Sequence, residues 1–187
     1  YGNELSSEGI DRARRLYGIE LSPKVLEEED RDGFFDGVTM WGVLEHVPEP
    51  MSLLQSAFRV LRDGGILFLY TPTWCLYDSI GLRLAQVSRN RWTVLIDRRI
   101  SEEHLQIYPM RSLRAACERI GFEMIMEEAV SEYNFKTAAY IESMGVPAAL
   151  RKSMALAIDG LIDAGLFFKN NARIYCRKVI GRVKGAS

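Results

Sequence analysis

Cysteine is scarce in this chain, and its few cysteines form no pattern. Cys75, Cys117 and Cys176 are the 3 in 187 residues, and most of them are flanked by apolar or helix-forming residues. A disulfide framework needs paired cysteines, and a structural zinc site needs CxxC pairs. The three cysteines suggest neither, and we interpret the thiols as reduced core side chains of a cytoplasmic protein.

The chain also lacks an excess of either charge and a long apolar run. Its 24 Lys and Arg residues stand against 25 Asp and Glu residues, and both signs are spread along the sequence. This balance gives no electrostatic reason to expect nucleic acid or an anionic membrane as a partner. No apolar run approaches the roughly 20 residues that cross a bilayer, and no signal-peptide pattern opens the chain. We expect a small-molecule partner, no nucleic acid and no membrane span.

Linkers rich in Ser, Gly or Pro are absent as well. A length of 187 residues suits one domain with a sizeable core. We therefore predict a single domain over residues 1–187. Because the first residue is Tyr and the opening residues resemble the middle of a domain, we also interpret the chain as part of a longer protein.

Hydrophobic periodicity predicts alternating helices and strands along most of the chain. Helices are expected at 9–17, 50–62, 109–122 and 147–166, and strands at 34–44, 66–72, 123–130 and 172–180. Ser6 or Ser7 can cap the first helix, Pro50 can start the second, the glycines at 64–65 can end it, and Gly121 can end the third. The strand, helix and strand within 34–72 match a parallel βαβ unit. The pattern predicts an open α/β sheet with helices on both faces. Residues 73–108 keep no single period, which we interpret as an insertion or lid above the sheet.

The carboxyl ends of the predicted strands gather the candidate functional residues. In open α/β sheets ligands bind outside these ends. Glu4, the segment from Trp41 to His46 and the segment from Thr71 to Trp74 all fall there in the predicted fold. We expect the functional site at this edge.

Three segments at these places carry a family resemblance. They read "FDGVTMWGVLEHVPEP", "RVLRDGGILFLYTP" and "HLQIYPMRSLRAACERIGF". In this order and spacing they resemble the class I S-adenosylmethionine-dependent methyltransferases, in the branch of the quinone-biosynthesis O-methyltransferases. The resemblance runs from the N-terminus to about Glu123 and again over the last strand. It implies a Rossmann-like sheet with an antiparallel last strand, S-adenosylmethionine as cofactor, and methyl transfer to a small-molecule acceptor.

The resemblance also implies cofactor-binding residues. In this family a carboxylate that ends the second strand accepts hydrogen bonds from both ribose hydroxyls, which assigns the ribose to Glu4 and the adenine to Leu5. Backbone groups and an apolar side chain after the fourth strand hold the methionine part, which assigns it to Trp41 and Gly42. From the residues alone, Glu4 also fits a solvated terminal glutamate and Trp41 fits core packing, and these alternatives stay open.

One family feature has no counterpart in the sequence. The first strand and the glycine-rich loop, where backbone approaches the cofactor closely, should precede Tyr1. We therefore expect the chain to lack this part of the cofactor site, to lack the neighbour of its strand at 34–44, and to bind S-adenosylmethionine weakly by itself.

Glu45 and His46 end the strand segment, and we weigh three roles for them. In the quinone O-methyltransferases an E-x-x-E-H pattern is associated with a divalent cation, but here Gly42 replaces the first carboxylate. Two adjacent ligands make a poor site for a hard cation that prefers six oxygens, so no metal is predicted. His46 suits a general base, because imidazole titrates near neutral pH and a hydroxyl acceptor must lose its proton. The alternative is structural, with both side chains fixing the loop by hydrogen bonds.

The insertion supplies further candidates for the acceptor side of the site. His104 stands where the family often has a histidine at the active-site mouth, and it also fits a surface histidine. Trp74, Tyr77, Trp92 and Tyr108 match the aromatic walls of an apolar acceptor pocket, or the packing of a lid on the sheet. Two hypotheses of function remain: an enzyme that methylates a small acceptor, and a non-catalytic or truncated member that keeps the fold as a binding module.

Overall fold

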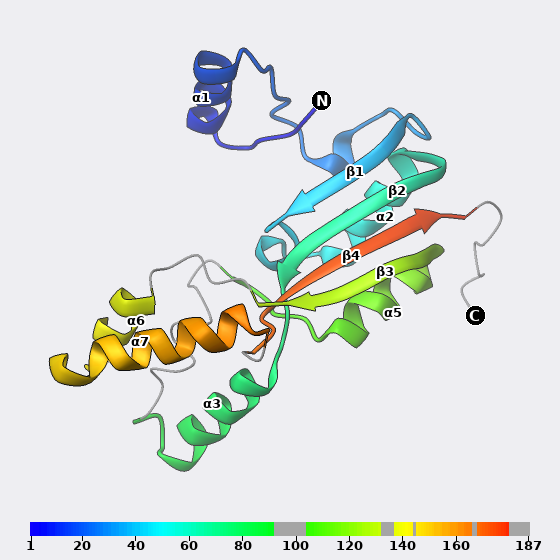
Figure 1. Ribbon diagram of the computed structural model, residues 1–187. Coiled ribbons are helices and arrows are strands. Elements are labelled where there is room, and N and C mark those ends of the chain that lie inside the picture. The colour runs from blue at the N-terminus through cyan, green and yellow to red at the C-terminus, as the bar shows by residue number, and fades with distance from the viewer. Residues whose placement is uncertain (92–103, 132–136, 144, 166–167, 180–187) are drawn as a thin grey trace.

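A four-stranded mixed sheet forms the centre of the molecule in the computed structural model (Figure 1), which describes residues 1–91, 104–131, 137–143, 145–165 and 168–179. The strands are β1 (Phe35–Trp41), β2 (Leu61–Pro72), β3 (Phe122–Val130) and β4 (Asn171–Lys178), in the order β1-β2-β4-β3. β1 pairs with β2 in parallel, and β4 runs antiparallel to both of its neighbours. The predicted α/β architecture and the antiparallel last strand are confirmed.

Helix α2 (Pro50–Val60) connects β1 to β2 and begins with Pro50 in its first turn, as the sequence predicts. The helix ends two residues earlier than expected, because Leu61 is already extended and pairs with Phe35 in the sheet. The glycines expected as the helix exit instead turn the chain inside β2, where Gly64 has a φ of +76°. The prediction of the connection is therefore right in type and wrong in boundary.

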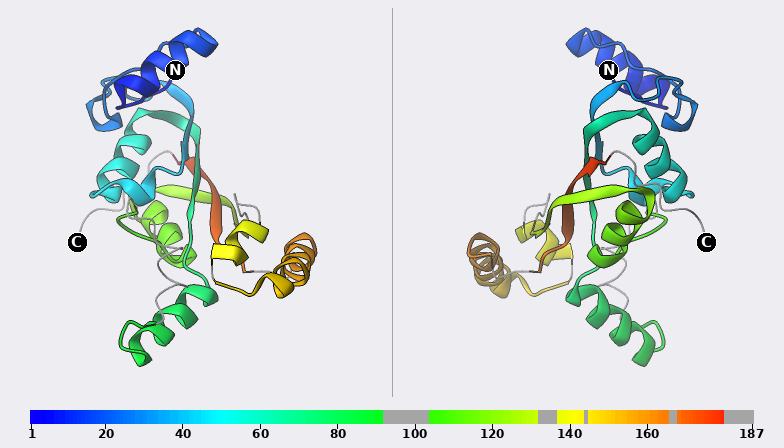
Figure 2. Two further views of the ribbon diagram at one scale, coloured as in Figure 1. Left: turned by 90° about the vertical axis from the view of Figure 1, so that its left-hand side faces the viewer. Right: turned by 90° about the vertical axis from the view of Figure 1, so that its right-hand side faces the viewer.

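The core lies between the sheet and the two helices α2 and α5 (Met110–Ile120). Leu54 and Leu113 from these helices meet Leu69 and Ile174 from the strands in one buried cluster. Gly121 ends α5 with a φ of 120°, as predicted. Figure 2 shows α2 and α5 on the same side of the sheet.

Two of the three cysteines belong to this core, and none forms a disulfide. Cys117 of α5 and Cys176 of β4 are both fully buried. Cys75 is partly exposed and directly precedes the helix that begins at Leu76. Hydrogen bonding to Cys117, together with burial, raises the pKa of the Cys176 thiol. Both thiols are core side chains, and that of Cys176 remains protonated at neutral pH.

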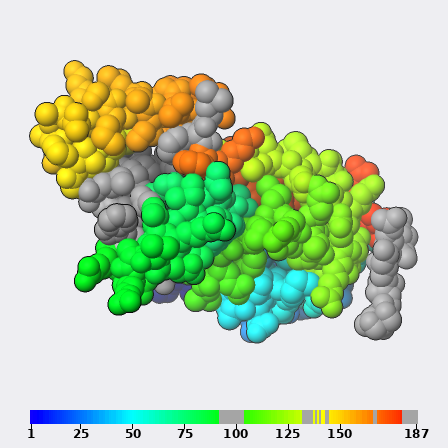
Figure 3. All heavy atoms as spheres, turned by 90° about the horizontal axis from the view of Figure 1, so that it is seen from below, coloured from blue at the N-terminus to red at the C-terminus, as the bar shows by residue number. Residues whose placement is uncertain are grey.

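The helices α3 (Leu76–Val87), α6 (Thr137–Ser143) and α7 (Ala148–Asp163) lie beyond the carboxyl ends of β1 and β2 (Figure 1). From below, α3 in green and the α6–α7 pair in yellow and orange form two separate projections (Figure 3). No helix among the described residues is long and apolar enough to cross a membrane.

The base of the 73–108 segment is closed by contacts between its two ends. Thr73 Oγ1 donates to the Tyr108 carbonyl at 2.8 Å, and the Trp74 amide donates to the same oxygen at 3.0 Å. Trp92, a predicted wall of the acceptor pocket, lies outside the described residues. These hydrogen bonds place Tyr108 beside the end of β2.

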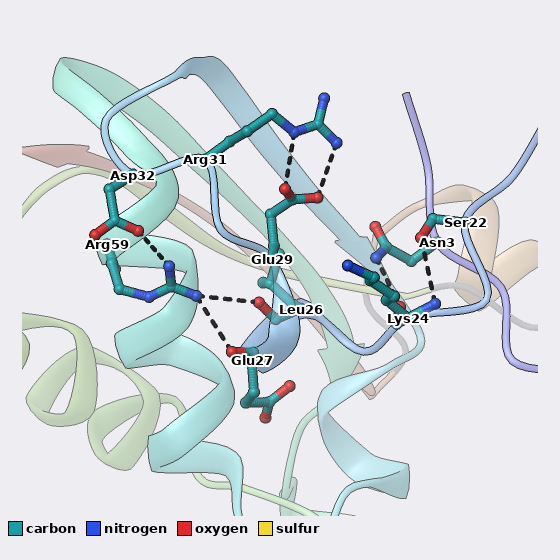
Figure 4. A network of polar contacts seen from close by, with 9 residues as sticks. All are labelled: Asn3, Ser22, Lys24, Leu26, Glu27, Glu29, Arg31, Asp32 and Arg59. Atoms are coloured by element: carbon teal, nitrogen blue, oxygen red, sulfur yellow. Dashed lines mark hydrogen bonds and ion pairs between the residues drawn. The ribbon is translucent and has the colours of Figure 1, made fainter.

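The N-terminal segment carries α1 (Ser7–Tyr17), which Ser6 caps by accepting from the Gly9 amide at 3.2 Å, as predicted. A polar network joins the following loop to α2 (Figure 4). In it, Arg59 of α2 donates to the Leu26 carbonyl at 3.4 Å and the Glu27 carbonyl at 3.3 Å. The helix thereby holds this loop, whose Leu26 side chain also packs against the core.

Candidate functional site

A glycine turn at the end of β1 begins the candidate site. Gly42 has a φ of +60°, and its amide donates to the Tyr70 carbonyl of β2 at 2.8 Å. The strand predicted to reach Leu44 therefore ends at Trp41, and residues Leu44–His46 form a short 3₁₀ turn. A Cβ atom on Gly42 would lie 3.4 Å from Glu45 Oε1, so the turn folds the chain back onto this carboxylate.

Glu45 is the buried centre of the site, with only 2% of its surface exposed. Thr71 Oγ1, at the end of β2, donates to Glu45 Oε2 at 2.9 Å. The Glu45 carbonyl accepts from the amides of Leu105 at 2.8 Å and Gln106 at 3.3 Å. One residue thus joins the end of β1, the end of β2 and the segment before α5.

These contacts bring the two histidines of the chain together. The rings of His46 and His104 lie 4.9 Å apart between centroids, and His46 Nε2 lies 3.9 Å from Glu45 Oε1. One ligand atom from each of Glu45, His46 and His104 lies within 4.8 Å of the others. Both histidines are catalytic candidates from their places in the sequence, which gives no reason to expect them in contact.

Two tyrosines near Glu45 remain protonated at neutral pH. Burial raises the pKa of Tyr108, and the negative charge of Glu45 raises it further. Burial likewise raises the pKa of Tyr70, with a smaller contribution from Glu45. The Tyr108 hydroxyl donates to the Leu44 carbonyl at 3.3 Å, which ties the same turn to the insertion. Both phenols can act as hydrogen-bond donors and not as bases.

Trp41 lies at the edge of the sheet rather than in the core. Trp41 is 65% exposed. Its ring packs against the rings of Phe68 and Tyr70, with centroids 4.8 and 5.6 Å away. Met40, its neighbour on β1, points into the core between the sheet and α2. The alternation along the strand therefore presents the Trp41 ring on the opposite face, where a ligand can reach it.

Glu4 and Leu5 lie elsewhere, beside α1. Glu4 Oε1 accepts from the Ser6 amide at 2.8 Å, and Leu5 is 66% exposed. The segment is held by a bridge between Asn3 and Ser22. The structure thus brings together His46, His104 and Glu45. The N-terminal segment that carries Glu4 and Leu5 lies with α1 beyond the β1 edge of the sheet (Figure 1).

Thr71 is central to this arrangement, whereas the sequence placed it at the functional edge without indicating a role for its hydroxyl. A hydroxyl at the carboxyl end of a buried strand, just before Pro72, was the only available signal. Its partner Glu45 is 26 positions away in sequence, so the pairing depends on the register of β1 against β2.

Comparison with known proteins identifies the family. A model of the methyltransferase domain matches residues 1–127. The chain belongs to the methyltransferase domain family. This confirms the resemblance that the three sequence segments indicated.

Relatives of this methyltransferase domain include two bacterial proteins named ubiquinone biosynthesis O-methyltransferase. That of Nitrosomonas europaea is 41% identical in an alignment 107 residues long, which covers 43% of this chain and 46% of the relative. That of Xanthomonas oryzae pv. oryzae is 38% identical in an alignment 68 residues long, which covers 32% of this chain and 28% of the relative. The chain spans less than half the length of these relatives.

Solved structures share the fold at low sequence identity. A geranyl diphosphate C-methyltransferase of Streptomyces coelicolor A3(2), solved with S-adenosyl-L-homocysteine, has a TM-score of 0.56 and 16% identity, covering 95% of this chain and 62% of that one. An S-adenosylmethionine-dependent methyltransferase of Archaeoglobus fulgidus has a TM-score of 0.55 and 16% identity, covering 95% and 75%. The [4+2]-cyclase SpnF has a TM-score of 0.58 and 22% identity, covering 96% and 66%. These likenesses establish the fold alone. SpnF has this fold although it is named as a cyclase and not as a methyltransferase.

Proposed function

We propose that this methyltransferase domain serves the transfer of a methyl group from S-adenosylmethionine to an oxygen of a small acceptor. The observation that carries the proposal is the meeting of His46 and His104 beside Glu45, at the carboxyl ends of β1 and β2, in a chain of this family. The names of the curated relatives favour a phenolic acceptor.

The chemistry needs few specialised side chains. The sulfonium of the cofactor already activates the methyl group, so the protein mainly has to align sulfur, methyl and acceptor oxygen. A hydroxyl acceptor loses its proton as the new bond forms, and an imidazole within hydrogen-bond reach can accept it. We assign this role to His46, with His104 beside it, because His46 is the more exposed of the two rings.

The proposed cofactor contacts come from two places. Trp41 offers an exposed ring and Gly42 a partly exposed backbone for the methionine part, while Glu4 and Leu5 serve the ribose and the adenine. In the present arrangement the Glu4 carboxylate accepts from the Ser6 amide, so Oε1 must share or exchange that bond when cofactor binds. The sequence contains no GxGxG loop, so we propose that the glycine-rich part of the cofactor site lies outside these 187 residues.

The test of activity uses the protein expressed from its complete reading frame. Formation of S-adenosylhomocysteine is measured against phenols, quinone precursors, sugars and lipids. We expect turnover with phenols, and a His46→Gln variant should lose at least about tenfold in kcat, since general bases contribute at least that much. Absence of turnover with every acceptor, despite cofactor binding, would favour the non-catalytic alternative.

Glu4 provides a separate test of the cofactor site in the same protein. A Glu4→Ala variant should raise the Kd for S-adenosylmethionine by about tenfold or more, because a lost pair of charge-assisted hydrogen bonds costs about 1.5–3 kcal/mol. Calorimetry measures the Kd, and a Glu8→Ala variant in the exposed first turn of α1 is the matched control. An unchanged Kd in Glu4→Ala would remove Glu4 from the site.

A further inference from the structure

We propose that Tyr70 and Arg173 bind a carboxylate of the methyl acceptor, so that the acceptor is a phenol that carries an acid group. Both residues belong to one row of side chains across the sheet, in the order Trp41, Tyr70, Arg173 and Glu128. The inference deepens the proposed function and rests on it for the identity of the acceptor. Binding of the acid group can be measured without it.

The row lies on the face of the sheet that is turned away from the core. Leu69 precedes Tyr70 and Ala172 precedes Arg173, and both of these preceding residues are buried in the core cluster with α2 and α5. Side chains alternate between the two faces of a strand. Tyr70 and Arg173 therefore point to the opposite face, where Trp41 also lies, and both are partly exposed to solvent.

The phenol and the guanidinium are placed to act together. Tyr70 and Arg173 are direct partners in the antiparallel pairing of β2 with β4, and such partners have Cβ atoms about 5 Å apart. Burial raises the pKa of Tyr70, and the positive charge of Arg173 partly offsets that rise. The protonated phenol donates one hydrogen bond, and the guanidinium offers a planar fork of donors that matches a carboxylate. Together they suit an anion with two oxygens.

Glu128 already contacts Arg173, but this contact is weak. The Arg173 Nη1 and Glu128 Oε2 atoms are 4.0 Å apart, and the two side chains are 38% and 51% exposed. An ion pair of this length and exposure contributes little to stability. An acceptor carboxylate at hydrogen-bond distance from the guanidinium would therefore replace the contact with Glu128 at small cost.

The spacing of the row fits an aromatic acid beside the proposed cofactor site. Trp41, which we assign to the methionine part of the cofactor, lies next to Tyr70 with ring centroids 5.6 Å apart. Neighbouring strands are about 4.8 Å apart, so Trp41 and Arg173 stand about 10 Å from each other across the sheet. One aromatic ring with a hydroxyl at one end and an acid at the other spans this distance with the reach of the guanidinium. The hydroxyl then lies on the side of β1, whose end carries the turn with His46.

The experiment measures acceptor binding without any methyl transfer. The protein expressed from its complete reading frame is titrated by calorimetry with 4-hydroxybenzoate and with its uncharged methyl ester. We expect the acid to bind about tenfold or more tightly than the ester, because hydrogen bonds to a charged group are the stronger ones. Equal Kd values for the two compounds, or binding of neither, would overturn the site.

Variants of Arg173 show whether this residue recognises the acid. Arg173→Gln should raise the Kd for 4-hydroxybenzoate by about tenfold or more and leave the Kd for the ester unchanged. Arg173→Lys keeps the charge without the planar fork and should lose less. Arg177→Gln is the matched control, because Arg177 lies on the same face of the same strand and its guanidinium is 3.9 Å from Glu123. This variant should bind the acid as the parent does.

Two further variants test the neighbours of Arg173 in the row. Glu128→Gln removes the competing carboxylate and should lower the Kd for the acid, whereas Tyr70→Phe removes a donor and should raise it. Circular dichroism establishes that each variant is folded, and Glu128→Gln keeps the test open if Arg173→Gln unfolds. Undiminished binding of the acid in folded Arg173→Gln, or weaker binding in Glu128→Gln, would contradict the proposal.

The two proposals fail separately. Binding of the acid that depends on Arg173, in a protein that methylates no acceptor, would keep the acid site and reject the enzyme. Methylation of neutral phenols as efficiently as of phenolic acids would keep the enzyme and reject the acid site.

Discussion

Gly42 shows how a single residue shapes the site. Its positive φ ends β1 and turns the chain back, so that the Glu45 carboxylate lies next to Gly42 at the end of the strand. Other residues adopt this backbone conformation at a cost of about 1–2 kcal/mol. The site therefore favours glycine at position 42 because of the backbone conformation of the turn.

We expect Gly42→Ala to lower the free energy of unfolding by about 1–2 kcal/mol, from backbone strain. The new Cβ would also lie 3.4 Å from Glu45 Oε1. Urea denaturation measures the change. Gly160→Ala in α7 is the matched control: no atom lies within 4 Å of its added Cβ, and alanine favours the helix, so this variant should gain up to about 1 kcal/mol. Equal effects at both glycines would contradict the role of the turn.

Thr71 makes a hydrogen bond to a charged and buried partner. Thr71→Val keeps the volume but removes the donor, and we expect the free energy of unfolding to fall by about 1.5–3 kcal/mol. Thr71→Ser should retain most of the stability. Thr39→Val, on the exposed part of β1, is the control and should change little. Thermal unfolding followed by circular dichroism compares the three, and a neutral Thr71→Val would mean that water replaces the lost hydroxyl.

At the scale of elements, the loop before β1 depends on ion pairs. Arg31 donates to both oxygens of Glu29, at 2.8 and 2.9 Å (Figure 4). This hydrogen-bonded pair lowers the pKa of Glu29 from 4.5 to about 2. Because the folded state holds the charged carboxylate, the pair stabilises the protein fully above about pH 4.5.

We therefore expect this stabilisation to disappear as the pH falls from about 4.5 toward 2. A Glu29→Gln variant should unfold more easily than the parent at pH 7, and the difference should shrink across that range. Urea midpoints at a series of pH values measure it. Glu27→Gln, in the same turn but with an exposed side chain, is the control. A difference that stays constant with pH would show that Glu29 acts through packing and not through its charge.

Local signals predicted the elements well, and tertiary contacts explain what they missed. The Ser6 cap, the proline at the start of α2 and Gly121 at the end of α5 follow from short-range chemistry, and each is found. The end of α2 was misplaced because pairing of Leu61 with Phe35 outweighs helical propensity. Helix α6 was not predicted at all.

At the scale of the whole molecule, the candidate site was half predictable. Sequence reasoning selected His46 and His104 and placed the site at the strand ends. It could not find their contact, since it depends on the Glu45 carbonyl accepting from the segment at 105–106. The sequence left open whether Trp41 packs in the core or contacts the cofactor. In the structure β1 is the edge strand, and the Trp41 ring is largely exposed.

The position of β4 has a consequence for how the protein is made. This strand comes late in the chain, yet it lies between β2 and β3 and is hydrogen-bonded to both. While the ribosome is still translating the preceding helix α7, β3 lacks the strand with which it pairs, and β2 lacks one of its two neighbours. We expect nascent chains that stop before Asn171 to stay open to protease, and chains released after Lys178 to become resistant. Protection of the shorter chains would show that the sheet closes without its late strand, and otherwise folding of this domain waits until β4 has been synthesised.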